Sequence, residues 1–368
     1  MSVRRFPPFA LAAVALLLAP RAATAQPADQ DAVDKAIDAG VRYLRQVQNP
    51  AFGYWGPGTG PGSGKGWGVG YTAMAGVALI ESGVPTSDPG LKKAAELVRV
   101  NARELDDTYE AALAILFLDR MRDKKYREEI QLLAGRLIAA QGPTGGWGYK
   151  VKKLSAKEAE NILTALRRMS QPPPPTYPAL RDRPGGLCIK AGDQVLLRPP
   201  PPFDPAKARA AALAGLLPAH RTLPVFDDAA GLPDDQKDAA TDNSNTHFAM
   251  LGLWAARKHD VPADRTFALV NRRFRTTQGP GGTWAYNFVR RGADGTGPMS
   301  CVALLGVAIG YVVSPDAAVR PERDPLLLKA FGALGGMVGE PAGTTANRPK
   351  PKDVGGLYFM WAMERIAV

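Results

Sequence analysis

The chain has 368 residues, with 46 Lys and Arg against 35 Asp and Glu, which gives a formal net charge of +11 and a sequence pI of about 9.6. Such a basic balance permits attraction to anionic lipid or polysaccharide, but we favour an ordinary solvated surface as its meaning. Beyond the N-terminal segment, no stretch approaches the roughly 20 uninterrupted apolar residues of a transmembrane helix, which excludes a membrane-spanning mature chain.

Residues 1–25 have the layout of a cleavable secretory signal peptide. Arg4 and Arg5 precede an apolar run from Phe9 to Leu18, and small residues at Ala23-Thr24-Ala25 offer a cleavage site near Ala25. Cleavage there leaves 43 Lys and Arg against 35 Asp and Glu, a net charge of +8. We therefore expect a secreted or periplasmic protein with no nucleic acid among its partners.

Amphipathic helices follow in the mature chain. Val33, Ile37, Val41 and Leu44 recur at helical spacing, which predicts a helix over 31–47 with one solvated face. The same reasoning predicts partly solvated helices over 90–104, 125–140, 263–277 and 324–338.

A second type of helix is apolar nearly all round and must be buried on most sides, as in Ala111–Leu118 and Ala249–Trp254. Helices of this type are predicted over 70–82, 107–121, 243–258, 298–312 and 354–368. Four of their starts carry a hydroxyl residue three positions before an alanine, namely Thr72, Thr108, Thr246 and Ser300. We expect each hydroxyl to cap its helix and each alanine to let neighbouring helices approach closely.

The two helix types alternate and form five pairs, with the amphipathic helix first in each. An outer ring of amphipathic helices around an inner ring of apolar ones is an α/α toroid, whose inner helices surround a funnel, and six pairs would close it. We predict an all-α fold of five to six pairs in a single domain over 26–368, although the length alone permits two domains.

A Pro-rich insertion at about 170–204 separates the third outer helix from its inner partner. Prolines at 172–175 and 199–202 disfavour helix, so we expect an excursion loop. Short helices near 156–169 and 206–217 are expected to pack on the body, and one is a candidate for the missing sixth pair. The last helix runs to Val368 without a C-cap signal, which predicts an exposed edge in the repeat array.

Three turns between outer and inner helices share a Gln, a Gly-rich step and a Trp. They run from Gln48 to Trp55, from Gln141 to Trp147 and from Gln278 to Trp284. A Gln amide at a helix end can bond terminal carbonyls, and a Trp over the turn buries about 200 Å². Glycines admit the tight backbone between them.

These turns resemble the hallmark of the prenyltransferase and squalene-cyclase repeat family, over about residues 31–368 apart from the insertion. The resemblance implies the toroid fold and a structural role for the Gln and Trp residues. It also implies candidate catalytic groups, because class II terpene cyclases protonate an alkene with an Asp-x-Asp-Asp-Thr-Ala motif at an inner-helix start.

The segment Glu104-Leu-Asp106-Asp107-Thr108-Tyr109 keeps the second and third acids and the Thr of that motif, with Glu for the first acid and Tyr for the last Ala. The resemblance makes Asp106 the candidate general acid, with Asp107 and Glu104 as its hydrogen-bonding support. The alternative, which we favour, is that the acids cap and stabilise a helix start. The segment from Asp242 to His247 has a similar location, but Ser244 and Asn245 replace its decisive acids.

Protein prenyltransferases of the same fold hold zinc through an Asp-x-Cys pair and a distant His. Neither Cys188 nor Cys301 has an Asp two residues before it, and the histidines are only His220, His247 and His259. We therefore expect no metal and no cofactor. Whether the two cysteines pair in an exported protein is left open.

Six aromatic or imidazole side chains fall on predicted inner helices, where they line an apolar cavity or fill it. They are Tyr109, His247, Phe248, Trp254, Tyr358 and Trp361. The sequence thus predicts an exported repeat protein that binds an apolar, isoprenoid-like or lipid-like ligand, or a protein partner, in a central funnel. The alternatives are a cyclase or isomerase acting through Asp106 and an interaction scaffold with an open repeat edge; the oligomeric state is left open.

Overall fold

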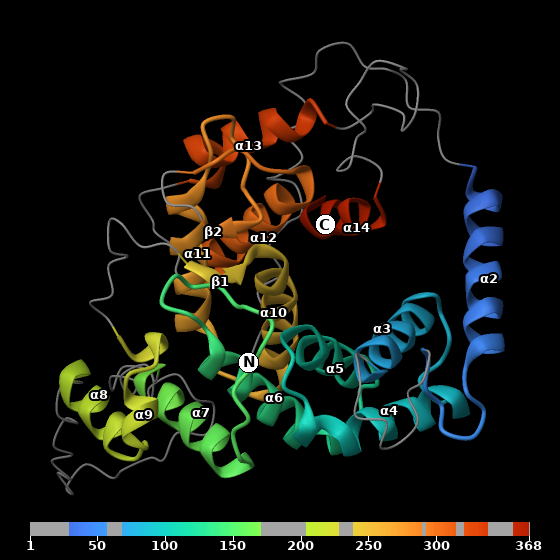
Figure 1. The fold of residues 1–368 in the computed structure, drawn as a ribbon, viewed down its shortest axis with the longest axis horizontal. Helices are drawn as coiled ribbons and strands as arrows, with labels where there is room; N and C mark the ends of the chain where they lie inside the picture. Colours follow the sequence, from blue (N-terminus) through green and yellow to red (C-terminus); the bar gives the residue numbers. More distant parts are fainter. Residues whose placement is uncertain are drawn as a thin grey trace, which may run out of the picture.

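The computed structural model describes residues 29–56, 68–170, 204–227, 238–288, 292–313, 320–337 and 356–367, and helices dominate them (Figure 1). The repeat helices are α2 (Gln30–Val47), α3 (Gly68–Glu81), α4 (Pro89–Asn101), α5 (Thr108–Arg120), α6 (Arg127–Ala140), α10 (Asn243–Ala256), α11 (Asp264–Thr277), α12 (Gly297–Val313), α13 (Pro325–Gly335) and α14 (Leu357–Ala367). Each lies where the sequence predicts a helix. Within the described ranges, no helix has the length and apolar character needed to cross a membrane.

The apolar helices α3, α5, α10, α12 and α14, which we call the inner series, follow one another in space. Each packs on the next, α3 on α5, α5 on α10, α10 on α12 and α12 on α14. Small residues make the contacts close, because Ala111 and Ala249 are fully buried and a Cβ added to Gly252 of α10 would lie 3.0 Å from Cα of Ala112 in α5. The predicted role of the alanines is consistent with this packing.

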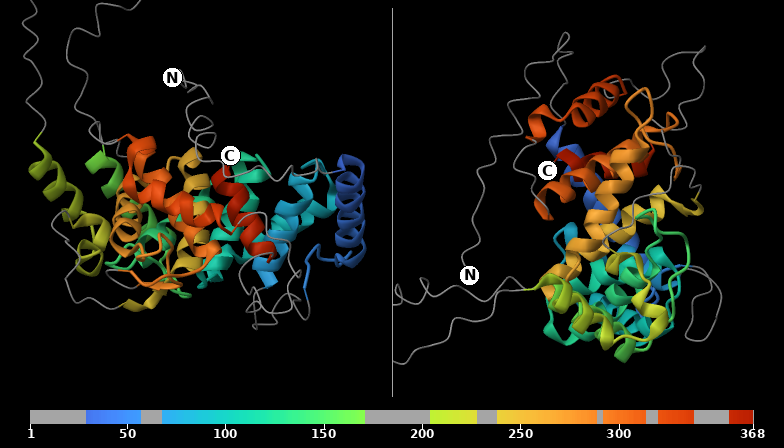
Figure 2. Two further views of the ribbon diagram at one scale, coloured as in Figure 1. Left: turned by 90° about the horizontal axis from the view of Figure 1, so that it is seen from above. Right: turned by 90° about the vertical axis from the view of Figure 1, so that its left-hand side faces the viewer.

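The helices predicted to be amphipathic pack against this series. The prediction of a solvated face is wrong for α6, because residues 132–139 are all buried. Helices α4 and α6 pack on α5, while α11 and α13 pack on α12 (Figure 1). Helix α2 differs, because none of its side chains is buried and it touches the rest mainly through α3. Figures 1 and 2 show it at the edge of the molecule.

The segment between α6 and α10 does not supply a sixth pair. Helix α7 (Ala156–Ser170) packs on α6, and α8 (Pro205–Ala214) packs on α7, so both lie beyond an outer helix and away from the inner series. Residues 171–203, which hold most of the predicted Pro-rich insertion, are outside the described residues. The expectation that one of these short helices completes the ring is therefore wrong.

Short elements connect the main helices. They are α9 (Pro218–Arg221), the 3-10 turns η1 (Ala102–Glu104), η2 (Lys124–Tyr126), η4 (Pro224–Phe226), η5 (Arg257–His259) and η6 (Pro321–Arg323), and the strands β1 (Asp238–Asp242) and β2 (Asn287–Phe288). The two strands pair antiparallel. The all-α prediction missed this small sheet, which forms where extended residues lead into α10 and follow the third Gln-Trp turn.

The glutamine of each Gln-Trp turn links its own turn to the next outer helix. Gln141 Nε2 donates hydrogen bonds of 3.0 Å to the carbonyl oxygens of Gly145 in the turn and Thr266 in α11. The corresponding bonds run from Gln48 to Gly53 and Gly90, and from Gln278 to Gly282 and Leu326, at 2.9 to 3.2 Å. Each amide therefore joins two repeats.

The tryptophan of each turn ends the outer helix and holds the inner one. Trp147 Nε1 donates to the Leu137 carbonyl in the last turn of α6 at 2.7 Å, and its backbone N–H donates to Thr246 Oγ1 of α10 at 3.2 Å. The same two bonds join Trp55 to Leu44 and Thr72, and Trp284 to Phe274 and Ser300. Carbonyls in the last turn of a helix lack a partner within it, so the indole stabilises the helix end. In the first Gln-Trp turn the Leu44 carbonyl also accepts the Gln48 backbone N–H at 3.1 Å.

A glycine with positive φ lets each turn lie directly against the next outer helix. Gly145 has φ +82°, and a Cβ added there would lie 2.2 Å from the Leu269 carbonyl oxygen in α11. Gly53 and Gly282 have φ +77° and +88°, and an added Cβ would meet α4 and α13 in the same way. A side chain at these positions would hold the two repeats apart.

The hydroxyl residues at the inner-helix starts are not the N-caps that the sequence predicts. The carboxylates of Asp107 and Asp242 cap α5 and α10, because a carboxylate is a strong acceptor and stands just outside the helix. Thr72, Thr246 and Ser300 lie inside their helices, and their hydroxyl oxygens instead accept the backbone N–H of the tryptophan in the preceding turn.

Candidate ligand cavity

A cavity of about 930 Å³ lies among the inner helices, at the end where α3, α5 and α10 finish. Every helix of the inner series contributes to its apolar lining, which consists of Val77, Leu116, Leu251, Trp254, Ala255, Leu305 and Trp361. Its volume falls in the range of about 300 to 1,000 Å³ that is typical of small-molecule sites. The remaining lining residues are mostly charged and exposed, so they form a rim around an apolar floor.

Two indoles dominate the floor. Trp254 is 37% exposed and is fixed from one side by the Arg257 guanidinium, 4.7 Å from its ring centroid. Trp361 packs against His247 and Phe248, with ring centroids 5.0 and 5.3 Å apart. Indole rings held in this way offer large, rigid apolar faces to a ligand.

A network of ion pairs at the rim connects the C-terminal ends of α3, α5 and α10. Arg120 of α5 bonds Glu81 of α3 at 2.7 Å and its own neighbour Asp119 at 3.1 Å. The Asp119 carboxylate, only 7% exposed, also contacts the side-chain nitrogens of Lys258 at 2.7 Å and His259 at 3.1 Å, both in the turn after α10. The network fixes the relative positions of the three helix ends and so the width of the opening.

The structure brings five of the six predicted ligand residues together in one aromatic cluster. Phe248 lies 4.7 Å from Tyr109 and 6.5 Å from Tyr358 between ring centroids, and it also contacts Trp361. Of these five only Trp361 reaches the cavity, so the cluster mainly fills the space between α5, α10 and α14. The sixth residue, Trp254, lies apart from the cluster and lines the cavity directly.

A hydrogen-bonded chain runs through this cluster. Tyr109 OH donates to Ser244 Oγ at 2.7 Å, Ser244 donates to Tyr358 OH at 3.4 Å, and Tyr358 OH lies 3.0 Å from His247 Nδ1. Burial, helped by the charge of Arg365, lowers the pKa of His247 to about 3. Burial also raises the pKa of Tyr109 to about 12 and raises the pKa of Tyr358. At neutral pH the chain is therefore uncharged and ties α5, α10 and α14 together.

The candidate catalytic acids lie elsewhere. Asp106 is 44% exposed at its side chain and pairs with Lys150 at 3.0 Å, and Glu104 is 78% exposed and lies 3.6 Å from Lys153. Neither acid lines the cavity, whose opening is at the other end of α5. Both carboxylates face solvent.

Asp107 has the capping geometry that we favoured from the sequence. Its carboxylate accepts the backbone N–H groups of Tyr109 and Glu110, at 2.9 and 3.4 Å. Burial raises the pKa of Asp107, and these bonds oppose the shift. The Asp107 carboxylate therefore acts as the N-cap of α5.

The charged rim between Asp119 and Arg127 is a feature that sequence reasoning missed. The available signal was a run of alternating charges, Asp119-Arg-Met-Arg-Asp-Lys-Lys-Tyr-Arg127, directly after a fully apolar helix. A run of this kind normally marks a solvated turn. Here the packing of α10 and α14 beside it turns one of its faces toward the cavity.

No family model matches the chain, and no curated protein or solved structure matches it either. Among the described residues, no cluster of three or more His, Cys, Asp or Glu is arranged to hold a metal ion. Cys301 is a free, buried thiol on α12, and Cys188 lies outside the described residues.

Proposed function

We propose that this protein is an exported member of the prenyltransferase and squalene-cyclase repeat type, with its helix pairs arranged as an open α/α toroid. Its proposed function is to bind an apolar ligand, isoprenoid-like or lipid-like, in the cavity of the inner series. One observation carries the proposal: apolar side chains from all five inner helices, including Trp254 and Trp361, converge on one cavity of about 930 Å³. Export is supported by the sequence alone, because residues 1–25 lie outside the described residues.

The proposal is for binding rather than for cyclase chemistry. Protonation of an alkene requires a carboxylic acid that meets the substrate in a water-excluding site. Asp106 instead meets Lys150 at the surface, far along α5 from the cavity lining. We therefore expect Asp106→Asn to leave ligand binding and helical content unchanged.

Thermal unfolding of the purified mature protein with and without a neutral C12 to C15 chain, such as dodecanol or farnesol, tests the proposal. A ligand that binds only the folded state raises the thermal midpoint by mass action. The rise should shrink in Trp254→Ala and persist in Asp106→Asn. An unchanged midpoint with both chains, together with no co-purified ligand in native mass spectrometry, would rule the proposal out.

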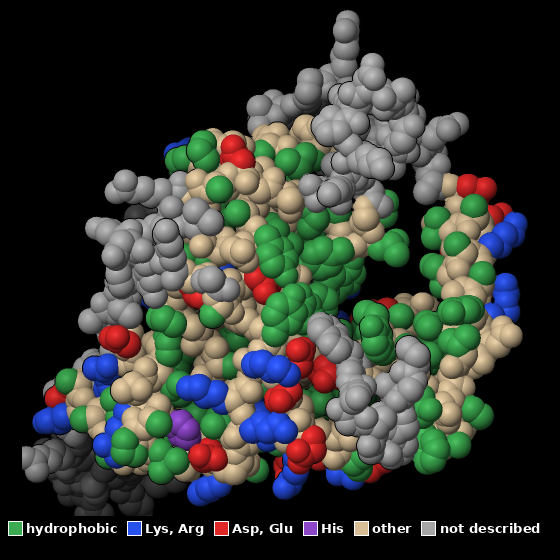
Figure 3. Space-filling view, viewed as in Figure 1, with side chains coloured by type: hydrophobic (Ala, Val, Ile, Leu, Met, Phe, Trp, Pro, Cys, Tyr) green, Lys and Arg blue, Asp and Glu red, His purple; other side chains and the backbone are tan. Residues whose placement is uncertain are grey.

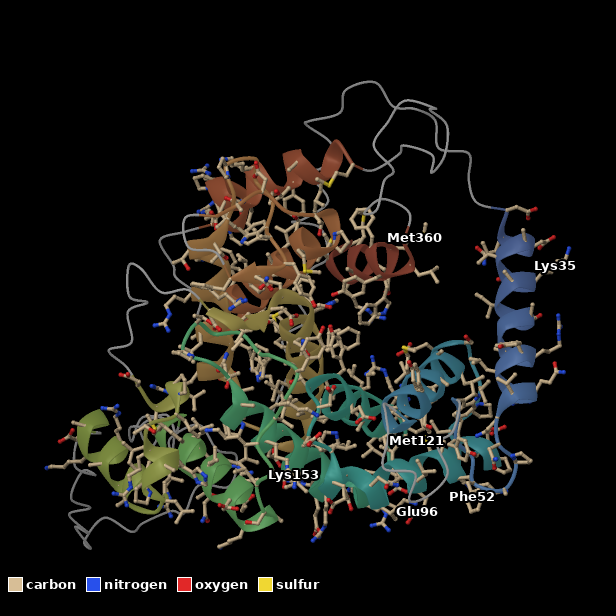
Figure 4. The ribbon with its side chains drawn as sticks, in the orientation of Figure 1. Lys35, Phe52, Glu96, Met121, Lys153 and Met360 are labelled. Atoms are coloured by element: carbon tan, nitrogen blue, oxygen red, sulfur yellow. The ribbon has the colours of Figure 1, made fainter. Side chains whose placement is uncertain are left out.

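A second candidate function, self-association through the open edge, is favoured by the exposed apolar faces of α2 and α14. Val33 and Ile37 of α2 are 39% and 43% exposed, and Leu357 and Met360 of α14 are 86% and 58% exposed. Figure 3 shows hydrophobic side chains on the side of α2 that faces the inner helices, and Figure 4 shows Met360 directed toward α2 and Lys35 directed away.

The charges of α2 fit a second copy of the same chain. Asp31, Asp34 and Asp38 lie with a single cation, Lys35, in its N-terminal half, whereas Arg42 and Arg45 lie in its C-terminal half. Two such helices packed antiparallel would oppose unlike charges, as a two-fold symmetric interface requires. Light scattering should then show a dimer that Ile37→Glu converts to a monomer, and a wild-type monomer at every concentration would exclude this function.

A further inference from the structure

We propose that the ligand of the cavity is an anionic amphiphile, a single apolar chain whose carboxylate or phosphate head group is held at the rim by Arg122 and Lys124. The inference rests on the proposed function and names its ligand class. It comes from the distribution of charge at the rim, once the ion pairs there are accounted for.

Most rim charges already have partners within the protein. Arg120 and Lys258 bond Glu81 and Asp119, while Arg365 contacts Glu364 at 3.1 Å. Arg127 pairs with Asp260, and Asp123 lies 3.5 Å from Lys125. The acids that line the cavity are thus each beside a cation.

Two rim cations are left over. Arg122 and Lys124 line the cavity, and neither side chain makes an ion pair or hydrogen bond with any residue that the structure describes. Both stand in the short connection between α5 and α6, two residues apart. Their side chains are exposed and so remain available to a ligand.

The helix ends at the rim do not account for these two cations. Carbonyls at the ends of α3, α5 and α10 attract positive charge. Arg120 in the last turn of α5 and Lys258 just after α10 already supply it. Arg122 and Lys124 therefore add positive charge beyond what the helix ends attract.

The backbone conformation of Arg122 sets the place where its side chain leaves the chain at the rim. Arg122 has φ +55° at the position after the C-cap of α5, where glycine is strongly favoured because it has no Cβ to clash. A long cationic side chain stands at this strained position, next to the cavity. Asp260, which follows η5, has a similar φ of +60°, so both residues end their helices in the left-handed conformation.

The floor and the rim together define an amphiphile. Trp254 and Trp361 offer apolar faces to the chain, and the two unpaired cations offer charge-assisted hydrogen bonds to the head group. A ligand with a neutral head group would contact the apolar floor but would gain no charge-assisted hydrogen bond at the rim. A cationic head group would meet the excess positive charge and be repelled.

Isothermal titration of the mature protein with four dodecyl probes tests the inference: dodecanoate, dodecyl phosphate, dodecanol and dodecyltrimethylammonium. We expect at least one anionic probe to bind about tenfold or more tightly than dodecanol, and to weaken as salt is added. The stronger of the two anionic probes identifies the head group as carboxylate or phosphate.

The double variant Arg122→Gln with Lys124→Gln should abolish the preference for the anionic probe and leave dodecanol binding unchanged. Its matched control, Lys92→Gln with Lys157→Gln, removes two exposed cations outside the cavity and should keep the preference. Equal affinity for anionic and neutral probes would overturn the inference while the proposed function stands. Tightest binding of the cationic probe would overturn it too, and failure of all four probes would overturn both.

Discussion

The substitution Gln141→Met probes the contact that joins one repeat to the next. The side chain is 3% exposed and donates to the carbonyls of Gly145 and Thr266. Met has a similar size, so the change removes the donors without opening a large cavity. Gly145 is buried, and no other described donor meets its oxygen, so its carbonyl would become unsatisfied.

The expected cost can be worked out from these contacts. An unsatisfied buried carbonyl costs about 1 to 3 kcal/mol, and the second hydrogen bond adds about 1 kcal/mol. The change also removes the buried Gln141 Oε1, which has no partner among the described residues, and this offsets about 1 kcal/mol. The net destabilisation is therefore about 2 kcal/mol.

Urea unfolding followed by far-UV circular dichroism measures this loss. Gln46→Met is the control, because the Gln46 side chain is exposed and makes no hydrogen bond with a described residue, so its effect should stay within about 0.5 kcal/mol. The equivalent change in the partly buried Gln48 should fall between the two. If Gln141→Met lowered the free energy of unfolding no more than Gln46→Met, the Gln141 amide would not be what stabilises the contact between the two repeats.

Three further predictions concern other contacts of the fold, and each is measured as a change in the urea midpoint. Gly145→Ala should destabilise the protein by about 1 to 2 kcal/mol because of its positive φ, and by a further 1 to 3 kcal/mol because the added Cβ clashes with Leu269. Gly83→Ala is the control, because Gly83 has φ +89° but open space around it, and it should show only the first cost. Equal losses in the two variants would contradict the close approach of the turn to α11. Arg273→Met should cost about 2 kcal/mol, because this fully buried guanidinium donates three side-chain hydrogen bonds, and removal of its Nη2, which has no partner among the described residues, offsets part of their loss. A loss below about 1 kcal/mol would show that these hydrogen bonds contribute little. Acidification between pH 6.5 and about 3 should destabilise the wild type by up to about 1.4 kcal/mol per pH unit through His247, because its lowered pKa makes the unfolded chain take up the proton first. His247→Asn, which keeps a polar atom near the Nδ1 position, should flatten that slope, and an unchanged slope would assign it to other groups.

Helix positions were predictable from the sequence because they depend on local spacing. The apolar repeat at Val33, Ile37 and Leu44 and the Gln-Trp spacing around Trp147 and Trp284 are readable without knowing what packs on them. Their structural role followed from the hydrogen-bonding capacity of the side chains. The structure added that each Gln also reaches the following repeat.

Features that depend on distant partners were not predictable. The corner after α4 has no Gln-Trp turn, and Arg136 of α6 bonds the carbonyls of Ala102 and Leu105 in its place. Arg136 is 4% exposed and stands in an apolar run of α6, but the carbonyls that it bonds belong to a segment 31 to 34 residues earlier in the chain. Arg273 is a similar case, because a basic outer-helix segment normally faces solvent. The cavity rim was missed for the same reason.

Quenching of tryptophan fluorescence by a chain brominated at its far end tests the central claim most directly, since bromine quenches only an indole that it touches. Bromododecanoate should quench the wild type at substoichiometric to stoichiometric concentrations, because Trp254 and Trp361 face the cavity. The double variant Trp254→Phe with Trp361→Phe should keep the fold and lose that quenching. Undiminished quenching in the variant, or none in the wild type, would contradict a ligand chain held between the inner helices.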